Sequence, residues 1–247
     1  MAGTTLTVLS GASRGLGLAL ARRSLAAGHR LITLARSPLA LPAPDGAHQH
    51  IQADLATVQG AQQASHALLQ ALQQAQAERF VLINNAGTVD PVAQAADLLD
   101  AQALARALQL NVASVMVLTA AFLQGTPAAA RRQVLNISSG AGRKPVSGWA
   151  AYGTSKAALD FYTQTLQLEN PTLQACSLAP GVIDTDMQAL IRSRSPQEFP
   201  EVERFLQLAR DQAFNTPEHV ADHLLRLAFD PSYPHDQVVV RVPAQAG

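Results

Sequence analysis

The sequence predicts a doubly wound α/β fold, in which helices cover both faces of one parallel sheet, and two observations support that prediction. Short runs of β-branched and aliphatic residues alternate with longer segments rich in Ala, Leu and Gln, as in repeated strand–helix units. The short runs are continuously apolar, as in Phe80-Val81-Leu82-Ile83, which is typical of strands buried on both faces. The seven expected strands cover residues 5–10, 30–35, 50–53, 80–84, 133–138, 173–178 and 237–242.

The segments between these strands carry helix-forming composition, with apolar residues three and four positions apart. Two other segments lack this spacing. Residues 38–44 (PLALPAP) predict a loop, and residues 192–200 hold two prolines and mixed charges where a substrate lid would be useful. The expected helices cover residues 15–27, 57–77, 101–123, 151–169 and 217–229.

Length and charge bound the classes of function. A chain of 247 residues is the size of one α/β domain, so we expect residues 1–247 to fold as a single unit. Because 18 Lys and Arg balance 18 Asp and Glu, the chain has no net charge to attract nucleic acid or anionic lipid. A single cysteine, Cys176, rules out an intrachain disulfide and argues against a cysteine zinc site. His219 and His223 are four apart but lack a third ligand nearby, so no metal site is expected.

The N-terminal segment does not resemble a signal peptide, because it lacks a basic region and its apolar run ends at once in a glycine-rich turn. The longest mostly apolar stretch, residues 112–123, is shorter than the roughly 20 residues that span a bilayer. We therefore expect a cytoplasmic protein whose partners do not include a membrane or nucleic acid.

A glycine-rich loop follows the first expected strand and opens a helix. Its glycines permit a tight turn and a close backbone approach, and the helix start presents free N–H groups to a pyrophosphate. This context predicts the dinucleotide-binding loop of a Rossmann fold, with the sequence Ser10-Gly11-Ala12-Ser13-Arg14-Gly15-Leu16-Gly17.

The end of the second strand indicates which dinucleotide is bound. NAD-binding folds usually place an acid there for the ribose 2′-hydroxyl, whereas this chain has Ala35-Arg36 and no acid before Asp45. A guanidinium matches a 2′-phosphate in charge and geometry, and Arg14 is close enough in the loop to help. The sequence favours NADP(H) over NAD(H), the alternative being that Arg36 is a solvated surface residue.

Tyr152 and Lys156 form an i, i+4 pair, which places them on one face of the expected helix. An ammonium beside a phenol stabilises the phenolate and moves the phenol pKa toward working pH. The spacing alone is also common on solvated helix faces.

In order and spacing, these motifs resemble the short-chain dehydrogenase/reductase family over essentially the whole chain. The matching set is the glycine loop, Asn84-Asn85-Ala86-Gly87, Asn111, Ser139, Tyr152, Lys156, and Pro180-Gly181 followed by Thr185. The resemblance implies that Tyr152 is the general acid in reduction, that Ser139 polarises the substrate carbonyl, that Lys156 lowers the pKa of Tyr152 and holds the nicotinamide ribose, and that Asn111 anchors a proton-relaying water. Ser138 competes with Ser139, whose spacing of 13 residues to Tyr152 matches the family interval.

The same resemblance assigns residues that line the cofactor. Asn85, Ala86 and Gly87 would line the ribose, and Asp54-Leu55 the adenine. Ile183 and Thr185 would hold the nicotinamide amide.

Two stretches, Gly148-Trp149-Ala150-Ala151-Tyr152 and residues 179–188, are similar to the sepiapterin reductase and benzil reductase branch of that family. The similarity implies an NADPH-dependent carbonyl reductase of small, aromatic or vicinal dicarbonyl compounds. It places Gly181 and Met187 beside the substrate and makes Trp149 an aromatic wall, although Trp149 also reads as an ordinary packing residue.

The sequence leaves three other functions open. Sepiapterin reductases hold the pterin with an acid in the last strand, and Val240 at that position argues against a pterin side-chain reductase. A dehydrogenase working in the oxidative direction and a catalytically idle NADP(H)-binding protein are the others. The intact set of Asn111, Ser139, Tyr152 and Lys156 argues against the idle protein. The resemblance further implies a homo-oligomer, a dimer or tetramer, built through helices 101–123 and 151–169.

Overall fold

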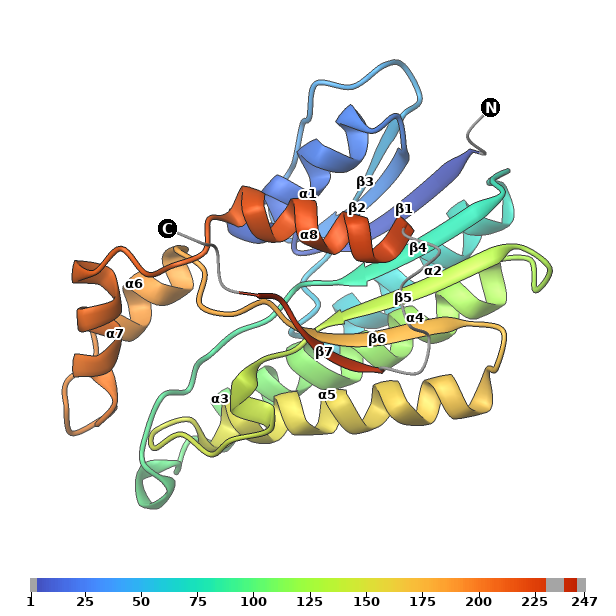
Figure 1. The fold of residues 1–247 in the computed structure, drawn as a ribbon. Helices are drawn as coiled ribbons and strands as arrows, with labels where there is room; N and C mark the ends of the chain where they lie inside the picture. The colour runs from blue at the N-terminus through green and yellow to red at the C-terminus, as the bar shows by residue number, and fades with distance from the viewer. Residues whose placement is uncertain (1–3, 230–237, 244–247) are drawn as a thin grey trace.

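The computed structural model describes residues 4–229 and 238–243, and in these residues the apolar runs form a seven-stranded parallel sheet (Figure 1). The strand order is β3-β2-β1-β4-β5-β6-β7, so the doubly wound fold predicted from the sequence is confirmed. The strands are β1 Thr5–Ser10, β2 Arg30–Ala35, β3 His48–Gln52, β4 Arg79–Asn84, β5 Arg131–Ile137, β6 Gln174–Ala179 and β7 Val239–Arg241.

Helices cover both faces of this sheet. α1 and α8 lie on one face, and α2, α4 and α5 on the other (Figure 1). The helices are α1 Gly15–Ala26, α2 Val58–Gln73, α3 Ala101–Leu108, α4 Ser114–Gly125, α5 Ala150–Glu169, α6 Asp186–Arg192, α7 Val202–Arg210 and α8 Pro217–Phe229, with the short turns η1 Ala95–Asp97, η2 Gln109–Ala113 and η3 Gly140–Gly142.

Alternate residues of each strand face opposite layers, and this builds two cores. Leu9 of β1 belongs to the cluster under α1 and α8, whereas its neighbour Val8 belongs to the cluster under α2 and α4. Side-chain caps fix where two of the covering helices begin. Thr57 accepts a hydrogen bond from the Gly60 N–H, and Asp100 accepts from the N–H groups of the first turn of α3.

The sheet order positions a ligand site. Strand order reverses at β1, because β2 and β3 lie on one side of it and β4 to β7 on the other. In a doubly wound sheet, ligands bind outside the carboxyl ends of the strands at this reversal. The glycine loop after β1 and the segment after β4 meet there.

The structure shifts several expected boundaries by a few residues. β3 begins at His48, β5 at Arg131 and β6 at Gln174. The expected last strand starts at Gln237, which lies outside the described residues, and β7 covers the centre of that range.

The expected single helix over residues 101–123 is interrupted, and this is a correction to the sequence prediction. Residues Gln109–Ala113 form a π-turn between α3 and α4. A π-turn accommodates one extra residue and commonly marks a functional position. Its centre is Asn111, whose side chain is buried.

α6 and α7 are absent from the sequence prediction. They flank residues 193–201, so the irregular segment expected over 192–200 is present except for Arg192, which ends α6. Both helices lie beyond the carboxyl edge of the sheet, where they form a cap (Figure 1). A third apolar cluster holds the cap together, and its buried members are Val89, Val92, Ala141, Trp149, Ile191, Phe199, Val202 and Phe205.

One helical run in the described part of the chain is long and apolar enough to cross a membrane, judged by length and composition only. α3, η2 and α4 are continuous over Ala101–Gly125, so the stretch 112–123 belongs to a run of 25 residues. Its Leu118 and Phe122 are buried in the core under the sheet, and the core helix of a folded domain passes the same test.

Replacing Phe122 by Ala tests the α4 side of the core. The ring is 0% exposed, so its removal leaves a cavity, and we expect a loss of about 3–5 kcal/mol in the free energy of unfolding. Leu99, which is 87% exposed, provides the control, because Leu99→Ala should change stability by less than about 0.5 kcal/mol. Guanidinium denaturation of both variants measures the difference, and equal midpoints would show that the packing is wrong.

Candidate active site

The glycine loop after β1 is shaped for a close approach by a ligand backbone or phosphate. Gly11 has φ +71°, and a Cβ at Gly17 would lie 1.9 Å from the Gly11 carbonyl oxygen, so neither position accepts a side chain in this conformation. Arg14 precedes α1 and makes no side-chain cap, and the first turn of α1 holds no acid. The helix start therefore presents N–H groups suited to an anion.

The segment after β4 is bound to this loop by a set of short contacts. The Asn85 amide donates to the carbonyls of Ser10 and Gly11 at 3.2 and 3.1 Å. The Ser10 hydroxyl accepts from the backbone N–H groups of Asn85 and Ala86, both at 3.1 Å. Ser10 opens the loop predicted from the sequence, but no role was predicted for its hydroxyl, although its place at the last position of β1 is a signal for one.

The other expected cofactor residues also follow carboxyl ends of strands. Ala35 is buried at the end of β2, and Arg36 after it is exposed. Arg14 pairs with Asp186 at the start of α6, with Nη1 to Oδ2 at 3.1 Å and both side chains largely exposed. Ser13 is exposed and Leu16 is buried in the α1 core.

Asp54 and Leu55, after β3, point to different partners. The Asp54 carboxylate accepts from the Ala56 N–H and lies 3.4 Å from Arg106 Nη2. The Leu55 side chain belongs to the core under α2, so Asp54 is the member of this pair that reaches the surface.

The segment after β6 returns to the glycine loop. A Cβ at Gly15 would lie 3.1 Å from the Thr185 methyl group, which places Thr185 directly beside the loop. Ile183 pairs with Asn215 through a β-bridge, and Gly181 has φ +79°. Residues 181–185 therefore form one side of the same site.

Gly87 marks the point where three functional segments meet. A Cβ there would lie 3.3 Å from Asn111 Oδ1 and 3.6 Å from Lys156 Nζ. The absence of a side chain at Gly87 lets η2 and α5 approach the end of β4.

Asn111 is held firmly in the π-turn. Its amide donates to the Thr88 carbonyl at 2.8 Å and to Ser155 Oγ at 3.0 Å, and its Oδ1 accepts from the Thr88 N–H at 2.9 Å. Ser155 Oγ in turn donates to the Tyr152 carbonyl at 2.7 Å. Thr88 and Ser155 are thus supporting residues that the sequence prediction missed.

Lys156 is 5% exposed, and its Nζ donates to the Ile137 carbonyl at 2.7 Å. Burial lowers the pKa of Lys156 to about 8, against an opposing effect of the Asp160 carboxylate. The ammonium lies 5.6 Å from the centroid of the Tyr152 ring, so the pair does share one face of α5.

Tyr152 differs from the sequence expectation in one respect. Burial raises the pKa of its hydroxyl, and a hydrogen bond with the Ser139 side chain opposes that rise. The lowering expected from Lys156 is therefore not seen in the structure, and the phenol keeps its proton at neutral pH.

The structure separates the two competing serines. Ser138 is buried and its Oγ donates to the Lys156 carbonyl at 3.4 Å, whereas Ser139 Oγ accepts from the Ala141 N–H at 3.2 Å and bonds to Tyr152. Ser139 therefore faces the phenol, and Ser138 faces the helix backbone.

The residues expected beside the substrate belong largely to the cap. Trp149 is 7% exposed and stacks on Phe199 with ring centroids 5.0 Å apart, and it meets Tyr152 edge to face at 5.4 Å. Met187 packs against the same cluster. Trp149 therefore serves both as a packing residue and as the neighbour of Tyr152.

Within residues 4–229 and 238–243, no three His, Cys, Asp or Glu side chains lie close enough together to hold a metal ion. His48 and His50 instead share the Thr33 hydroxyl, at 2.8 and 2.9 Å.

Comparisons with known proteins agree with this geometry. The family model for short chain dehydrogenase matches residues 5–196. A benzil reductase ((S)-benzoin forming) of Bacillus subtilis (strain 168) is 35% identical over 230 residues, covering 90% of this chain and 92% of the relative. A sepiapterin reductase of Meriones unguiculatus is 37% identical over 225 residues, covering 85% of each chain.

Solved structures show the same fold. The crystal structure of the KRED1-Pglu enzyme superposes with a TM-score of 0.85 at 32% identity, over 96% of this chain and 100% of that one. 4-Hydroxyisoleucine dehydrogenase complexed with NADH superposes at 0.79 with 19% identity, over 98% of each chain, which shows the fold alone. On the family model and these relatives, the chain belongs to the short-chain dehydrogenase family of oxidoreductases.

Proposed function

We propose that this protein is an NADPH-dependent carbonyl reductase of small dicarbonyl compounds, aromatic ones included. The observation that carries the proposal is that Ser139, which follows β5, meets Tyr152, and that Tyr152 and the buried Lys156 share one face of α5 beside Gly87. A protein that only binds a dinucleotide has no chemical need for such a cluster.

The residues present fit a nicotinamide dinucleotide. The glycine loop is too tight for any side chain at Gly17, and the uncapped start of α1 offers N–H groups to a pyrophosphate. We assign Asn85, Ala86, Gly87 and Lys156 to the nicotinamide half, together with Ile183 and Thr185. A bound nicotinamide would supply a hydride to the carbonyl carbon of the substrate.

The side chains manage the charge and the proton that the reaction requires. A carbonyl oxygen gains negative charge during reduction, and the Ser139 and Tyr152 hydroxyls are the donors that stabilise it. Tyr152 delivers its proton to that oxygen, and the raised phenol pKa keeps this proton available at neutral pH. The Lys156 ammonium then stabilises the phenolate.

Asn111 has a supporting role in this scheme. Both donors of its amide are committed to Thr88 and Ser155, but Oδ1 keeps a second lone pair. A water donating to that lone pair would lie toward Lys156 across Gly87, so it suits the return of a proton to the Lys156 amine after that amine has passed one to the Tyr152 phenolate.

Arg36 and Arg14 support NADP(H) as the cofactor. Arg36 is exposed directly after β2, where a ribose 2′-phosphate would lie, and no acid occupies the position. Arg14 approaches from the glycine loop, although Asp186 competes for its guanidinium at 3.1 Å.

The cap supports an apolar or aromatic dicarbonyl substrate. Trp149, Phe199 and Phe205 form an aromatic cluster whose Trp149 edge meets Tyr152. Gly181 and Met187 lie in the segment that leads into this cap, and we assign both to the substrate side. The relatives named benzil reductase act on such compounds.

A pterin side chain is the second candidate substrate, because the sepiapterin reductase described above is 37% identical to this chain. Val240 packs its side chain against the core on the α8 face, and its carbonyl accepts from Arg143. An apolar residue at this place does not bind a pterin ring, which favours the dicarbonyl.

We further propose a cytoplasmic homo-oligomer. Phe161 and Leu168 on α5 and Met116 on α4 are exposed, and a second copy packed on these helices would cover them. Neither nucleic acid nor a membrane is expected as a partner.

Replacing Tyr152 by Phe tests the proposed general acid. We expect kcat for benzil and 1-phenyl-1,2-propanedione to fall at least about a hundredfold, while NADPH binding is kept. NADPH oxidation at 340 nm measures the rate and cofactor fluorescence measures binding. Tyr162→Phe, on the same helix, is the matched control and should keep its activity.

The same panel, extended by sepiapterin and a simple monoketone, decides the substrate class. Preference for the diketones supports the proposal, and preference for sepiapterin moves the protein to pterin reduction. NADPH binding without turnover of any of them supports an idle binding protein.

Replacing Arg36 by Ala tests the cofactor choice. Loss of a charge-assisted contact to the 2′-phosphate should lower the ratio of kcat/KM for NADPH over NADH about ten- to a hundredfold. Arg131→Ala, at the exposed amino end of β5, should leave the ratio unchanged. An unchanged ratio in Arg36→Ala would exclude this assignment.

The pH dependence of reduction follows from Lys156. Its amine is an ammonium below its pKa of about 8 and neutral above, so kcat/KM should fall as pH rises through 8. Lys156→Arg keeps its charge throughout this range, so its profile should lose the break, whatever its absolute rate. A wild-type profile that is flat from pH 7 to 9 would contradict the role of Lys156.

A further inference from the structure

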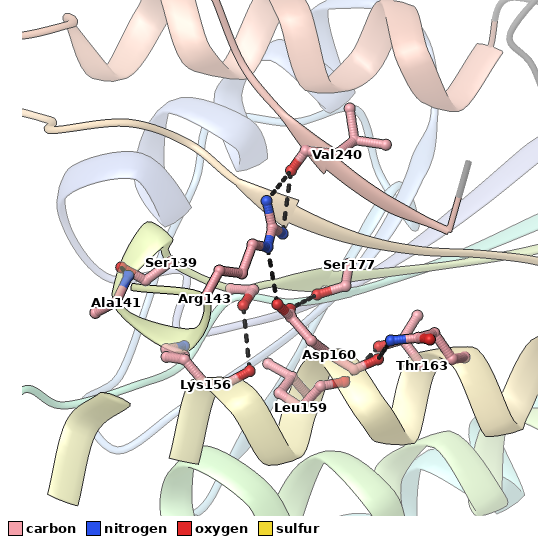
Figure 2. A network of polar contacts seen from close by, with 11 residues as sticks. Ser139, Ala141, Arg143, Lys156, Leu159, Asp160, Thr163, Ser177 and Val240 are labelled. Carbon is pink, nitrogen blue, oxygen red and sulfur yellow. Dashed lines mark hydrogen bonds and ion pairs between the residues drawn. The ribbon is translucent and has the colours of Figure 1, made fainter. Parts of the chain in front are cut away.

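Asp160 is a buried carboxylate that the reaction described above does not use. It lies one turn after Lys156 on α5, on the side facing the sheet, and is 7% exposed. Figure 2 shows its two side-chain partners, Ser177 of β6 and Arg143 at the end of η3. A buried carboxylate needs such partners, because burying an unpaired charge is costly.

One carboxylate oxygen binds the sheet and the other binds the loop that carries Ser139. Ser177 of β6 donates its hydroxyl to Oδ1. Arg143 donates Nε to Oδ2 at 2.9 Å, and its two terminal nitrogens donate to the Val240 carbonyl of β7 at 3.3 Å (Figure 2). Asp160 therefore connects α5 with β6 and with the end of η3, and Arg143 extends the connection to β7.

The turn η3, which follows Ser139, has little freedom because it packs closely on α5. A Cβ at Gly142 would lie 2.7 Å from the Lys156 carbonyl carbon, and one at Gly153 would lie 2.9 Å from the Ala141 oxygen. η3 is thus packed directly on the turns of α5 that hold Tyr152 and Lys156. Arg143 ends this turn, four residues after Ser139, and its ion pair with Asp160 keeps the turn pressed on the helix.

From these contacts we infer that Asp160 is a positioning residue for the proposed reductase reaction: with Arg143 it sets the place of Ser139 against Tyr152, and its charge holds Lys156 as an ammonium. Only the expected change in kcat depends on the proposed function. The arrangement of charges around Lys156 exists whatever the substrate is.

The groups around Lys156 can be named element by element. Tyr152 and Asp160 lie on α5 itself, and Arg143 lies beyond Asp160 at the end of η3. β5 contributes the neutral Ile137 carbonyl and η2 the neutral Asn111 amide. Asp160 supplies the negative charge, and Arg143 partly offsets it.

This arrangement makes opposite predictions for the two members of the ion pair. Asp160→Asn removes the negative charge and should move the Lys156 pKa down by about half to one pH unit, whereas Arg143→Met removes the positive charge and should move it up. Both variants release η3, so both should lower kcat about tenfold or more while KM for NADPH changes less than about twofold.

Nuclear magnetic resonance can read the Lys156 pKa without any turnover. The chain has only two lysines, Lys144 and Lys156, so ¹³Cε-lysine labelling gives two side-chain signals, and Lys144→Arg assigns them. Titrating wild type, Asp160→Asn and Arg143→Met from pH 6 to 11 gives the three pKa values. Should Asp160→Asn fail to fold, Asp160→Asn combined with Arg143→Met is compared with Arg143→Met alone, and the added Asp160→Asn should again move the Lys156 pKa down.

Opposite movements of the Lys156 signal, together with a loss in kcat at constant KM, support the inference. A folded Asp160→Asn with an unmoved Lys156 signal and wild-type kcat would overturn it. A lower melting temperature with no movement of the signal would also overturn it, because Asp160 would then act on stability alone. If the wild type reduces no carbonyl, the proposed function fails, while the titration still decides the role of Asp160.

Discussion

The glycine loop, Asn85 and Ser139 each follow directly on the carboxyl end of a parallel strand, and this constraint organises the site. In a parallel sheet all strands end at one edge, so segments far apart in the sequence collect there without any separate device. The residues after β1, β4, β5 and β6 meet in this way. Glycines at the closest approaches, Gly17, Gly87 and Gly142, set how near these segments can come.

The buried Lys156 depends on that convergence. An ammonium at 5% exposure loses most of its hydration, and its pKa falls to about 8 as a result. The Ile137 carbonyl at 2.7 Å and the Asp160 carboxylate one turn away offset part of this cost. The same low-polarity surroundings raise the pKa of Tyr152, so the two pKa values move apart and burial favours the uncharged form of both groups.

Local patterns were sufficient to predict much of this protein. Apolar strands alternating with helices predicted the sheet, and the spacing of Tyr152 and Lys156 predicted their common helix face. The π-turn at Asn111 was not predicted, because it depends on contacts of Asn111 with Thr88 and Ser155 that no local sequence pattern contains. The cap helices α6 and α7 were not predicted because helices of seven and nine residues are too short to be stable alone and depend on distant residues, here Trp149 and Val89. The role of Asp160 was not predicted for the same reason, since its partners lie on other elements.

The position of β1 at the reversal of strand order also bears on how the chain is made. β1 is paired on both sides, with β2 and with β4, and β4 begins 74 residues after β1 does. During synthesis one side of this apolar strand has no partner until residue 84 has left the ribosome, and non-local parallel pairing of this kind is slow. Between the synthesis of β1 and that of β4, the nascent chain exposes an unpaired apolar strand edge. A chaperone would act during this period.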